Sequence, residues 1–188
     1  MYLSLLTLQK GAPSVRQCLR NAHDMHRTVM SGFGDVEPSA ARSELGVLYR
    51  LQEKRSGELY LYVLSSVYPD WSRLQYGFRQ AAGSPKNLDA LQEALIPGRV
   101  LGFDLLCMPA KKVACDRKNS RRRLLVTQEE RAQWLSRKAE QNGFLLCWLR
   151  EEGQSKVYVH KGRPDGKAVY TGVHYRGELR IMDAQKFW

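Results

Sequence analysis

The chain has 188 residues and a formal net charge of +11, from 30 lysines and arginines against 19 aspartates and glutamates. Hydrophobic residues at 43% and charged residues at 26% are typical of globular proteins and exclude a disordered or fibrous chain. The apolar runs are too short for a membrane span of ~20 residues, and the apolar start lacks the basic region and cleavage site of a signal peptide. A protein this basic favours a polyanionic partner, above all a nucleic acid.

Strand and helix patterns alternate over the first 110 residues. Apolar residues spaced by three and four predict one amphipathic helix, which opens with the capping-box pattern Ser14-x-x-Gln17 and ends at Gly32. A turn with Ser56 and Gly57 joins two strand patterns into a predicted hairpin. The resulting β-α-β-β-α-β order is the ferredoxin-like arrangement. The predicted elements are residues 3–8, 14–31, 45–51, 59–64, 88–95 (a helix capped by Asn87) and 100–108.

The second half of the chain begins the same order again. Thr127-x-x-Glu130 predicts a capping box at the start of a helix, and Asp183 is the predicted cap of a last helical turn. The expected fold class is therefore α+β, with two tandem ferredoxin-like domains at residues 1–110 and 127–188 and a basic connection at residues 111–126. Strands are predicted at residues 144–149, 157–160, 168–175 and 179–182.

A dense basic segment lies between the two predicted domains. It carries seven cations and one acid, Asp116, so thirteen residues contribute +6 (seven minus one) of the total +11. Clustered cations repel one another unless a polyanion neutralises them, and the planar arginine group suits phosphate oxygens and guanine edges. We interpret the segment as a nucleic-acid clamp; a solvated linker between domains is the alternative. The cations are Lys111, Lys112, Arg117, Lys118, Arg121, Arg122 and Arg123.

Two histidines on the first predicted helix are the candidate catalytic residues. His23 and His26 lie outside the apolar stripe, and His23 follows Arg16 and Arg20 and precedes Arg27 at helical spacing. Neighbouring cations favour the neutral imidazole, which can accept a proton. The pair therefore suits acid–base catalysis on a ribose 2′-hydroxyl, with the arginines balancing phosphate charge. An ordinary pair of surface histidines is the alternative.

Other kinds of site have less support in the sequence. A metal ion shared by the two histidines needs a further ligand and is opposed by Arg27, so we expect no metal and no cofactor. No P-loop, G-x-S-x-G, dinucleotide-binding or H-E-x-x-H motif is present. The four cysteines form no C-x-x-C pair, which favours reduced thiols in a cytoplasm. Tyr60 and Tyr62 share one face of a strand, where base stacking or ordinary packing are the two interpretations.

The order and spacing of several motifs resemble the CasE family, the repeat-processing endoribonuclease subunit of the type I-E CRISPR Cascade complex. Each motif is modest by itself, but together they span nearly the whole chain. The motifs are Met1-Tyr2-Leu3-Ser4, His23-Asp24-Met25-His26-Arg27, Met108-Pro109-Ala110-Lys111-Lys112, Gln133-Trp134-Leu135-x-Arg137-Lys138 and Gly177-Glu178-Leu179-Arg180-Ile181-Met182-Asp183.

The resemblance implies an activity and partners. The family has two ferredoxin-like domains and cleaves precursor CRISPR RNA at the base of the repeat hairpin. The cleavage needs no metal: a 2′-hydroxyl attacks the adjacent phosphate and leaves a 2′,3′-cyclic phosphate. The enzyme then stays on the mature guide RNA in Cascade, beside the backbone subunit at the 3′ hairpin, with no membrane partner. The alternatives are a non-catalytic subunit that only binds the hairpin and a basic DNA-binding regulator, for which the sequence has no recognition-helix pattern.

The resemblance also assigns residues. The catalytic histidine of the family falls on His26, whereas its helper tyrosine falls on His23, where this sequence departs from the family. The basic segment from Lys111 to Arg123 matches the region that grips the hairpin stem, and Arg20 and Arg27 are expected to contact phosphate. The family continues beyond the last predicted strand with a full helix, a glycine-rich loop and a final strand. Because this chain ends at Trp188, the second domain is expected to be incomplete at its C-terminus.

Overall fold

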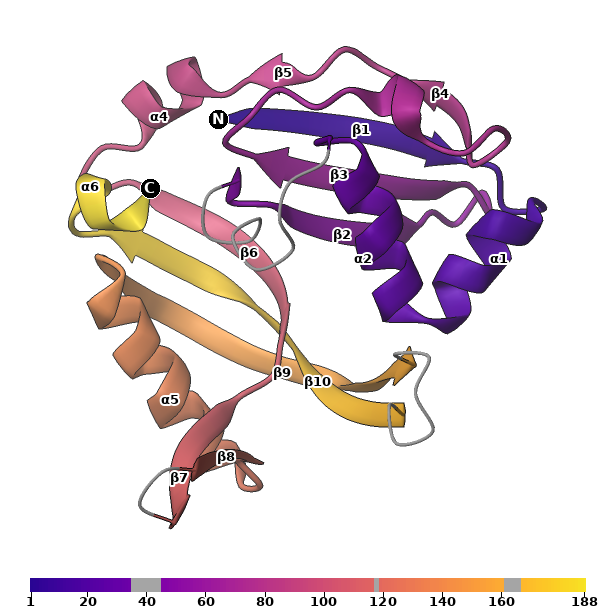
Figure 1. Cartoon of the computed structure of the whole chain (residues 1–188). Coiled ribbons are helices and arrows are strands. Elements are labelled where there is room, and N and C mark those ends of the chain that lie inside the picture. The colour runs from indigo at the N-terminus through magenta and orange to yellow at the C-terminus, as the bar shows by residue number, and fades with distance from the viewer. Residues whose placement is uncertain (35–44, 117–118, 161–166) are drawn as a thin grey trace. The chain divides into compact units, whose positions relative to one another are not determined.

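The structure is a computed structural model that describes residues 1–34, 45–116, 119–160 and 167–188 (Figure 1). The chain forms two compact units. The first comprises Met1–Leu91 and Tyr158–Ala168, and the second comprises Gln92–Val157 and Val169–Trp188. The fold class is α+β, as predicted. The expected boundary after residue 110 does not coincide with the division between the units, because residues 92–110 belong to the second unit.

The first unit contains an antiparallel sheet in the order β2–β3–β1–β4, with β5 paired to the start of β1 (Figure 1). Every second residue of β3 is buried, from Leu59 to Ser65, as are Leu6 and Leu8 of β1. This alternation buries one face of the sheet against the core. The hairpin predicted from Ser56 and Gly57 is confirmed as β2 and β3. The strands are β1 Tyr2–Leu8, β2 Leu48–Glu53, β3 Leu59–Ser65, β4 Arg79–Ala82 and β5 Lys86–Asn87.

Two helices pack on this buried face where the sequence pattern predicted one. Asn21 has extended backbone angles of φ −142° and ψ 107°, and its side chain caps the second helix by accepting a hydrogen bond from the N–H of His23. The capping box predicted at Ser14 is also wrong. Ala12 is the N-cap of the first helix without a side-chain bond, and Pro13 is suited to the first helical position. The helices are α1 Pro13–Arg20 and α2 Ala22–Ser31.

The segment between β3 and β4 contains a short 3₁₀ turn, Trp71–Arg73. Trp71 is buried and its ring meets that of Phe33 edge-on, with centroids 5.7 Å apart. The predicted short helix is confirmed as α4, Asp89–Ala94. The amide oxygen of Asn87 accepts a hydrogen bond of 2.7 Å from the N–H of Asp89, as expected for its cap.

The sheet of the second unit places β10 between β6 and β9 (Figure 1). β6 pairs antiparallel with β10, from Val100 opposite Arg180 to Cys107 opposite Val173. The assignment of this strand to the first domain is therefore wrong, because its partner lies some seventy residues further along the chain. β9 and β10 are each one long strand where the pattern predicted two. The strands are β6 Val100–Cys107, β9 Phe144–His160 and β10 Lys167–Ile181.

Two helices belong to the second unit. α5, Gln128–Gln141, starts with the predicted capping box between Thr127 and Glu130, and its Leu135 packs into a core cluster with Val173 and Tyr175. α6, Ala184–Phe187, is capped by Asp183 as predicted. No helix in the described parts of the chain is long and apolar enough to cross a membrane.

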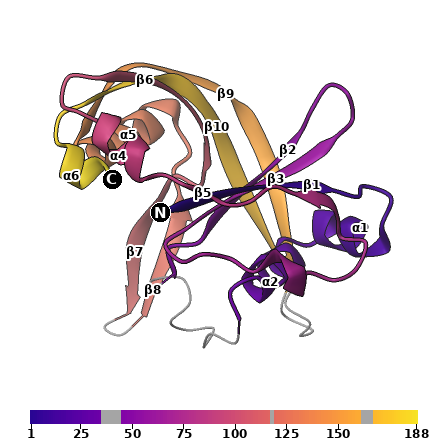
Figure 2. The same cartoon turned by 90° about the horizontal axis from the view of Figure 1, so that it is seen from above.

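The basic segment forms a hairpin and not an irregular connection. β7, Ala110–Asp116, pairs antiparallel with β8, Asn119–Leu124, in a separate two-stranded sheet. The two strands lie side by side in both views and extend away from α5 (Figures 1 and 2). Basic residues of the segment thus lie on two paired strands of the second unit.

Candidate active site and nucleic-acid interface

The two candidate catalytic histidines lie on the first turns of α2. His23 is the second residue of the helix and His26 follows three residues later, so the two positions are neighbours on one helix face. Both residues are partly buried, whereas Met25 and Val29 face the core. The free N–H groups and partial positive charge of a helix start favour a nearby anion such as phosphate. The structure therefore keeps the predicted pair together, and its catalytic role stays a prediction.

Asn21 is the residue that holds the start of this helix. Its amide oxygen accepts hydrogen bonds from the N–H groups of His23 (3.1 Å) and His160 (2.9 Å). Its amide nitrogen donates to the carbonyl oxygen of His160 (3.0 Å) and to Oδ2 of Asp24 (2.9 Å). An asparagine side chain has two donors and two acceptor sites, so every one of them is used here. Asn21 thereby ties the end of β9 to the junction of α1 and α2 within the first unit.

The break between α1 and α2 separates the arginines that the sequence pattern placed in one row. Arg16 and Arg20, on α1, line a shallow pocket of about 480 Å³ together with Asn21 and His160. Arg27, on α2, lines a different pocket of about 380 Å³. All three arginines are exposed. The predicted phosphate contacts Arg20 and Arg27 thus line two different pockets, which share Gln17 as a lining residue.

The described cysteines with shifted pKa values are not suited to nucleophilic catalysis. Burial raises the pKa of Cys18, partly offset by a hydrogen bond with Thr28, and burial raises the pKa of Cys107 to about 11. The thiolate is the nucleophilic form, so both side chains are neutral thiols near pH 7. No group of three or more histidine, cysteine, aspartate or glutamate side chains that could hold a metal ion occurs among the described residues.

The β7–β8 register brings cations of the basic segment opposite one another. Lys111 pairs with Arg123 and Lys112 with Arg122 across the two strands. Like charges directly opposite one another are unfavourable, and a bound polyanion would relieve the repulsion. Arg121 is placed by its backbone on β8, while Arg117 and Lys118 lie outside the described residues.

One acid lies close to these cations. Oε1 of Glu130, on the first turn of α5, is 3.5 Å from Nζ of Lys111. Hydrogen bonds from the backbone N–H groups of Val126 and Thr127 lower the pKa of Glu130, and Lys111 lowers it further. Lys112 and Arg123 are exposed. They are the described hairpin cations best placed to meet phosphate.

Sequence reasoning missed Asn21 and His160 as parts of this site. An asparagine before a polar helical turn is a common N-cap, and this local signal could have identified the break in the helix. Its contact with His160 spans 139 positions along the chain and has no local signal. Tyr60 and Tyr62 alternate with the buried Leu59, Leu61 and Val63, so both belong to the face of the sheet opposite the helices.

Comparison with known proteins places the chain in a family. A model of the family described as "CRISPR associated protein" matches residues 1–188. The CRISPR-associated endoribonuclease Cse3 of Thermus thermophilus is 29% identical over 197 residues, which cover 99% of this chain and 89% of that protein.

Two solved structures agree over the whole fold. A CRISPR endoribonuclease Cse3 bound to a 19-nucleotide RNA has a TM-score of 0.81 and 28% identity, covering 100% of this chain and 89% of that one. Thermus thermophilus Cse3 bound to an RNA representing a pre-cleavage complex has a TM-score of 0.79 and 28% identity, covering 99% and 87%. The resemblance to CasE is confirmed by these matches, and the chain belongs to the CRISPR associated protein family.

Proposed function

We propose that this protein is an endoribonuclease that cleaves precursor CRISPR RNA at the base of the repeat hairpin and stays bound to the product as a subunit of Cascade. The observation that carries the proposal is the pair His23 and His26 on the first turns of α2, with exposed arginines on α1 and α2. The similarity of the whole chain to a protein named as a CRISPR-associated endoribonuclease supports this activity. The RNA bound in two similar structures supports RNA as the ligand.

In the proposed reaction His26 accepts the proton of the ribose 2′-hydroxyl at the cleavage site. The 2′-oxygen attacks the adjacent phosphorus, and the bond from phosphorus to the 5′-oxygen of the next nucleotide breaks. A proton from an imidazolium of the pair goes to that 5′-oxygen. The products are a 2′,3′-cyclic phosphate and a 5′-hydroxyl, and no proton is gained or lost overall. Neither step needs a metal ion, because the histidines move the protons.

His23 and Arg27 have distinct proposed roles beside His26. His23 stands where the family has a helper tyrosine, and it orients the 2′-hydroxyl or shares the proton transfer. Arg27 follows His23 by four residues on the same helix, so it is placed to balance the charge that develops on the phosphate oxygens. Arg20 lies with Arg16 at a separate pocket and is proposed to contact a neighbouring phosphate.

The β7–β8 hairpin is proposed to hold the RNA stem. A protein element that neutralises several phosphates releases counterions, so its affinity falls steeply with salt concentration. This hairpin carries the exposed Lys112 and Arg123, and also Lys111, which pairs with Glu130. The remaining cations of the segment are proposed to act with them. A stem held in this way leaves the strand at its base for cleavage, and continued grip explains retention of the product in Cascade beside the backbone subunit.

The test is cleavage of a CRISPR repeat hairpin by the full chain in EDTA. We expect cleavage to persist in the chelator and to stop when the 2′-hydroxyl before the cut is replaced by hydrogen. His26→Ala should abolish cleavage and leave RNA affinity nearly unchanged. His174→Ala is the matched control, because His174 lies on β10 with its ring nitrogen 3.3 Å from Oγ of Ser155 and has no role in the proposal.

Three outcomes would contradict the proposal or part of it. Tight, hairpin-specific binding without cleavage would identify a non-catalytic RNA-binding subunit. An unchanged rate in His26→Ala would remove His26 from the mechanism. Equal affinity for unstructured RNA or duplex DNA would contradict hairpin recognition.

A further inference from the structure

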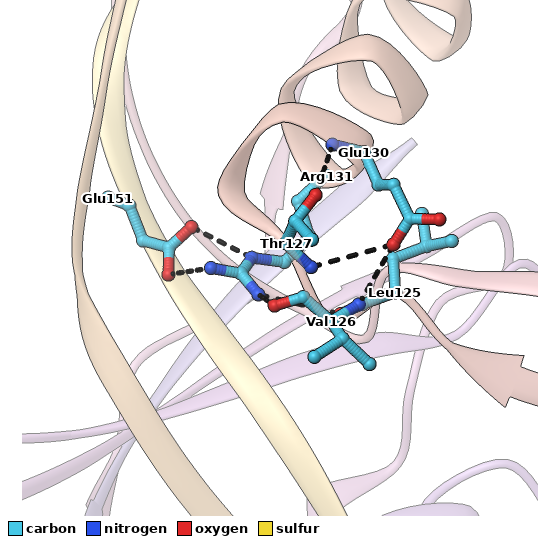
Figure 3. Close-up of polar contacts among 6 residues, drawn as sticks. All are labelled: Leu125, Val126, Thr127, Glu130, Arg131 and Glu151. Atoms are coloured by element: carbon cyan, nitrogen blue, oxygen red, sulfur yellow. Dashed lines mark hydrogen bonds and ion pairs between the residues drawn. The ribbon is translucent and has the colours of Figure 1, made fainter.

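The root of the basic hairpin contains a buried ion pair with no part in the proposed chemistry. Arg131 of α5 donates from Nε to Oε2 of Glu151 on β9 at 2.9 Å, and from Nη2 to Oε1 at 2.7 Å (Figure 3). The side chains are only 8% and 13% exposed. This bidentate geometry fixes the guanidinium plane in direction as well as in position.

The third nitrogen of this guanidinium points at the backbone that follows β8. Nη1 of Arg131 donates to the carbonyl oxygen of Val126 at 2.5 Å and lies 3.5 Å from that of Leu125 (Figure 3). The N–H of Leu125 in turn donates to the carbonyl oxygen of Pro109 at 3.0 Å, immediately before β7. Arg131 therefore holds the point where the two strands of the hairpin leave the body of the unit.

Glu130, the neighbour of Arg131, binds the same connection from its other side. Its Oε2 accepts hydrogen bonds from the N–H groups of Val126 (3.2 Å) and Thr127 (3.5 Å), and its own N–H donates to Oγ1 of Thr127 at 3.2 Å (Figure 3). Two adjacent side chains of one helix thus bind the N–H groups of Val126 and Thr127 and the carbonyl groups of Leu125 and Val126 in the connection between β8 and α5. Such a connection has little freedom to swing.

A contribution to stability alone does not account for this arrangement. Apolar side chains of similar volume often replace a buried ion pair at no loss of stability, because taking both charges out of water offsets their attraction. An apolar pair would not, however, hold the carbonyl group of Val126. What the pair adds is a fixed geometry between the hairpin, α5 and β9.

We propose that Arg131 is a positioning residue for RNA binding: with Glu151 it fixes the direction of the β7–β8 hairpin, so that the hairpin cations meet the stem in one preset arrangement. The inference rests on the proposed function, because it takes the hairpin to be the RNA clamp. A hairpin whose direction is already fixed loses less conformational entropy on binding RNA than one that moves freely. Loss of the pair should therefore weaken binding although every cation of the hairpin is still present.

The experiment compares Glu151→Gln with Glu152→Gln on the full chain. Both remove one negative charge from the same strand, but Glu152 is 3.6 Å from Nη1 of Arg176 and also pairs with Arg150, away from Arg131. The dissociation constant for a CRISPR repeat hairpin RNA is measured over a range of salt concentrations. Removing an acid should by itself strengthen binding to RNA, so the positioning role predicts a change of opposite sign.

We expect Glu151→Gln to bind about tenfold or more weakly than wild type and with a shallower salt dependence, since fewer phosphates are neutralised. Glu152→Gln should bind as wild type or better. Equal dissociation constants and salt slopes for the two variants would overturn the inference, whereas failure of the wild-type chain to bind the hairpin would instead refute the proposed function.

A second pair of variants separates positioning from loss of folding. Arg131→Lys keeps the charge but loses the forked geometry, and Leu135→Ala weakens the core under the same helix while Arg131 and Glu151 are both still present. Positioning predicts weaker binding and a shallower salt slope for Arg131→Lys, and an unchanged slope for Leu135→Ala. If Glu151→Gln does not fold, the comparison of Arg131→Lys with Leu135→Ala decides. Equal salt slopes of RNA binding for these two variants would reject the inference.

Discussion

Replacing the side-chain nitrogen of Asn21 by oxygen, Asn21→Asp, changes one group at the junction of α1 and α2. Helix capping alone predicts no effect, because aspartate caps helices as well as asparagine does. The structure predicts a loss. The two bonds that the oxygen accepts remain, but the two that the nitrogen donates, to the carbonyl of His160 and to Asp24, are replaced by contacts between oxygens.

The size of the effect follows from these contacts. Two lost hydrogen bonds cost about 1 kcal/mol each. A carboxylate placed at the position now 2.9 Å from Oδ2 of Asp24 adds repulsion of about 1 kcal/mol even in bulk water, and more where water is partly excluded. The free energy of unfolding should therefore fall by at least about 3 kcal/mol, which for a chain of this length lowers the melting temperature by roughly 6–12 °C or more.

The repulsive part of this deficit should depend on pH. Protonation of either carboxyl group removes the repulsion between residues 21 and 24, so this part is present at pH 7 and shrinks as pH falls towards 4. The N–H groups of His23 and His160 stabilise the charged form of the new carboxyl group and oppose this trend.

The assay is urea unfolding followed by circular dichroism at pH 7 and pH 4.5. Asn87→Asp is the control, because Asn87 caps α4 through its amide oxygen, which aspartate retains. We expect a large loss at position 21 and little change at position 87. Equal stability of Asn21→Asp and wild type at pH 7 would refute the reasoning, since it would mean that the two hydrogen bonds donated by the Asn21 amide do not stabilise the fold.

Three further predictions concern the basic hairpin, the cysteines and one close approach of two strands. Changing residues 121–123 to glutamine should weaken binding of the RNA hairpin and lower the slope of log affinity against log salt concentration by about 2. An unchanged slope would mean that the basic segment is only a solvated linker. With a pKa of about 11, Cys107 is thiolate in only about one molecule in a thousand at pH 8. Iodoacetamide should therefore label the exposed Cys147 before Cys107, as followed by mass spectrometry. Equal labelling rates of the two cysteines would contradict the burial of Cys107. Gly177→Ala places a methyl group against a backbone carbonyl of β9 and should lower stability by about 2 kcal/mol, measured by the urea midpoint. Gly172→Ala meets only a flexible side-chain end, and a loss as large there would contradict the distinction.

Features encoded by neighbouring residues were predictable from the sequence. The capping box of Thr127 and Glu130, the cap at Asp183 and the hairpin around Gly57 each depend on groups within a few positions of one another. The same reasoning was wrong at Ser14, because Pro13 already begins the helix there. Local signals therefore located most elements but not every boundary.

Which strands pair was beyond this kind of reasoning. The strand Val100–Cys107 was assigned to the first predicted domain, but it pairs with residues 173–180 of β10 in the second unit. Strand pairing is decided by which faces can be buried together, and the partner can lie anywhere along the chain. The long strands β9 and β10 also continue through polar stretches, such as residues 150–156, that have no strand pattern of their own.

The sequence by itself determined the chemical groups of this protein: its concentrated positive charge, the paired histidines His23 and His26 on one helical segment, and the motifs shared with the CasE family. These are properties of residue type and short spacing. Only the tertiary structure decided how the groups are held, through Asn21 against the distant His160, and through Arg131 bound to Glu151 and to the backbone after β8. The physical reason is that hydrogen bonds between distant segments form only after the chain has folded, so no local pattern records them.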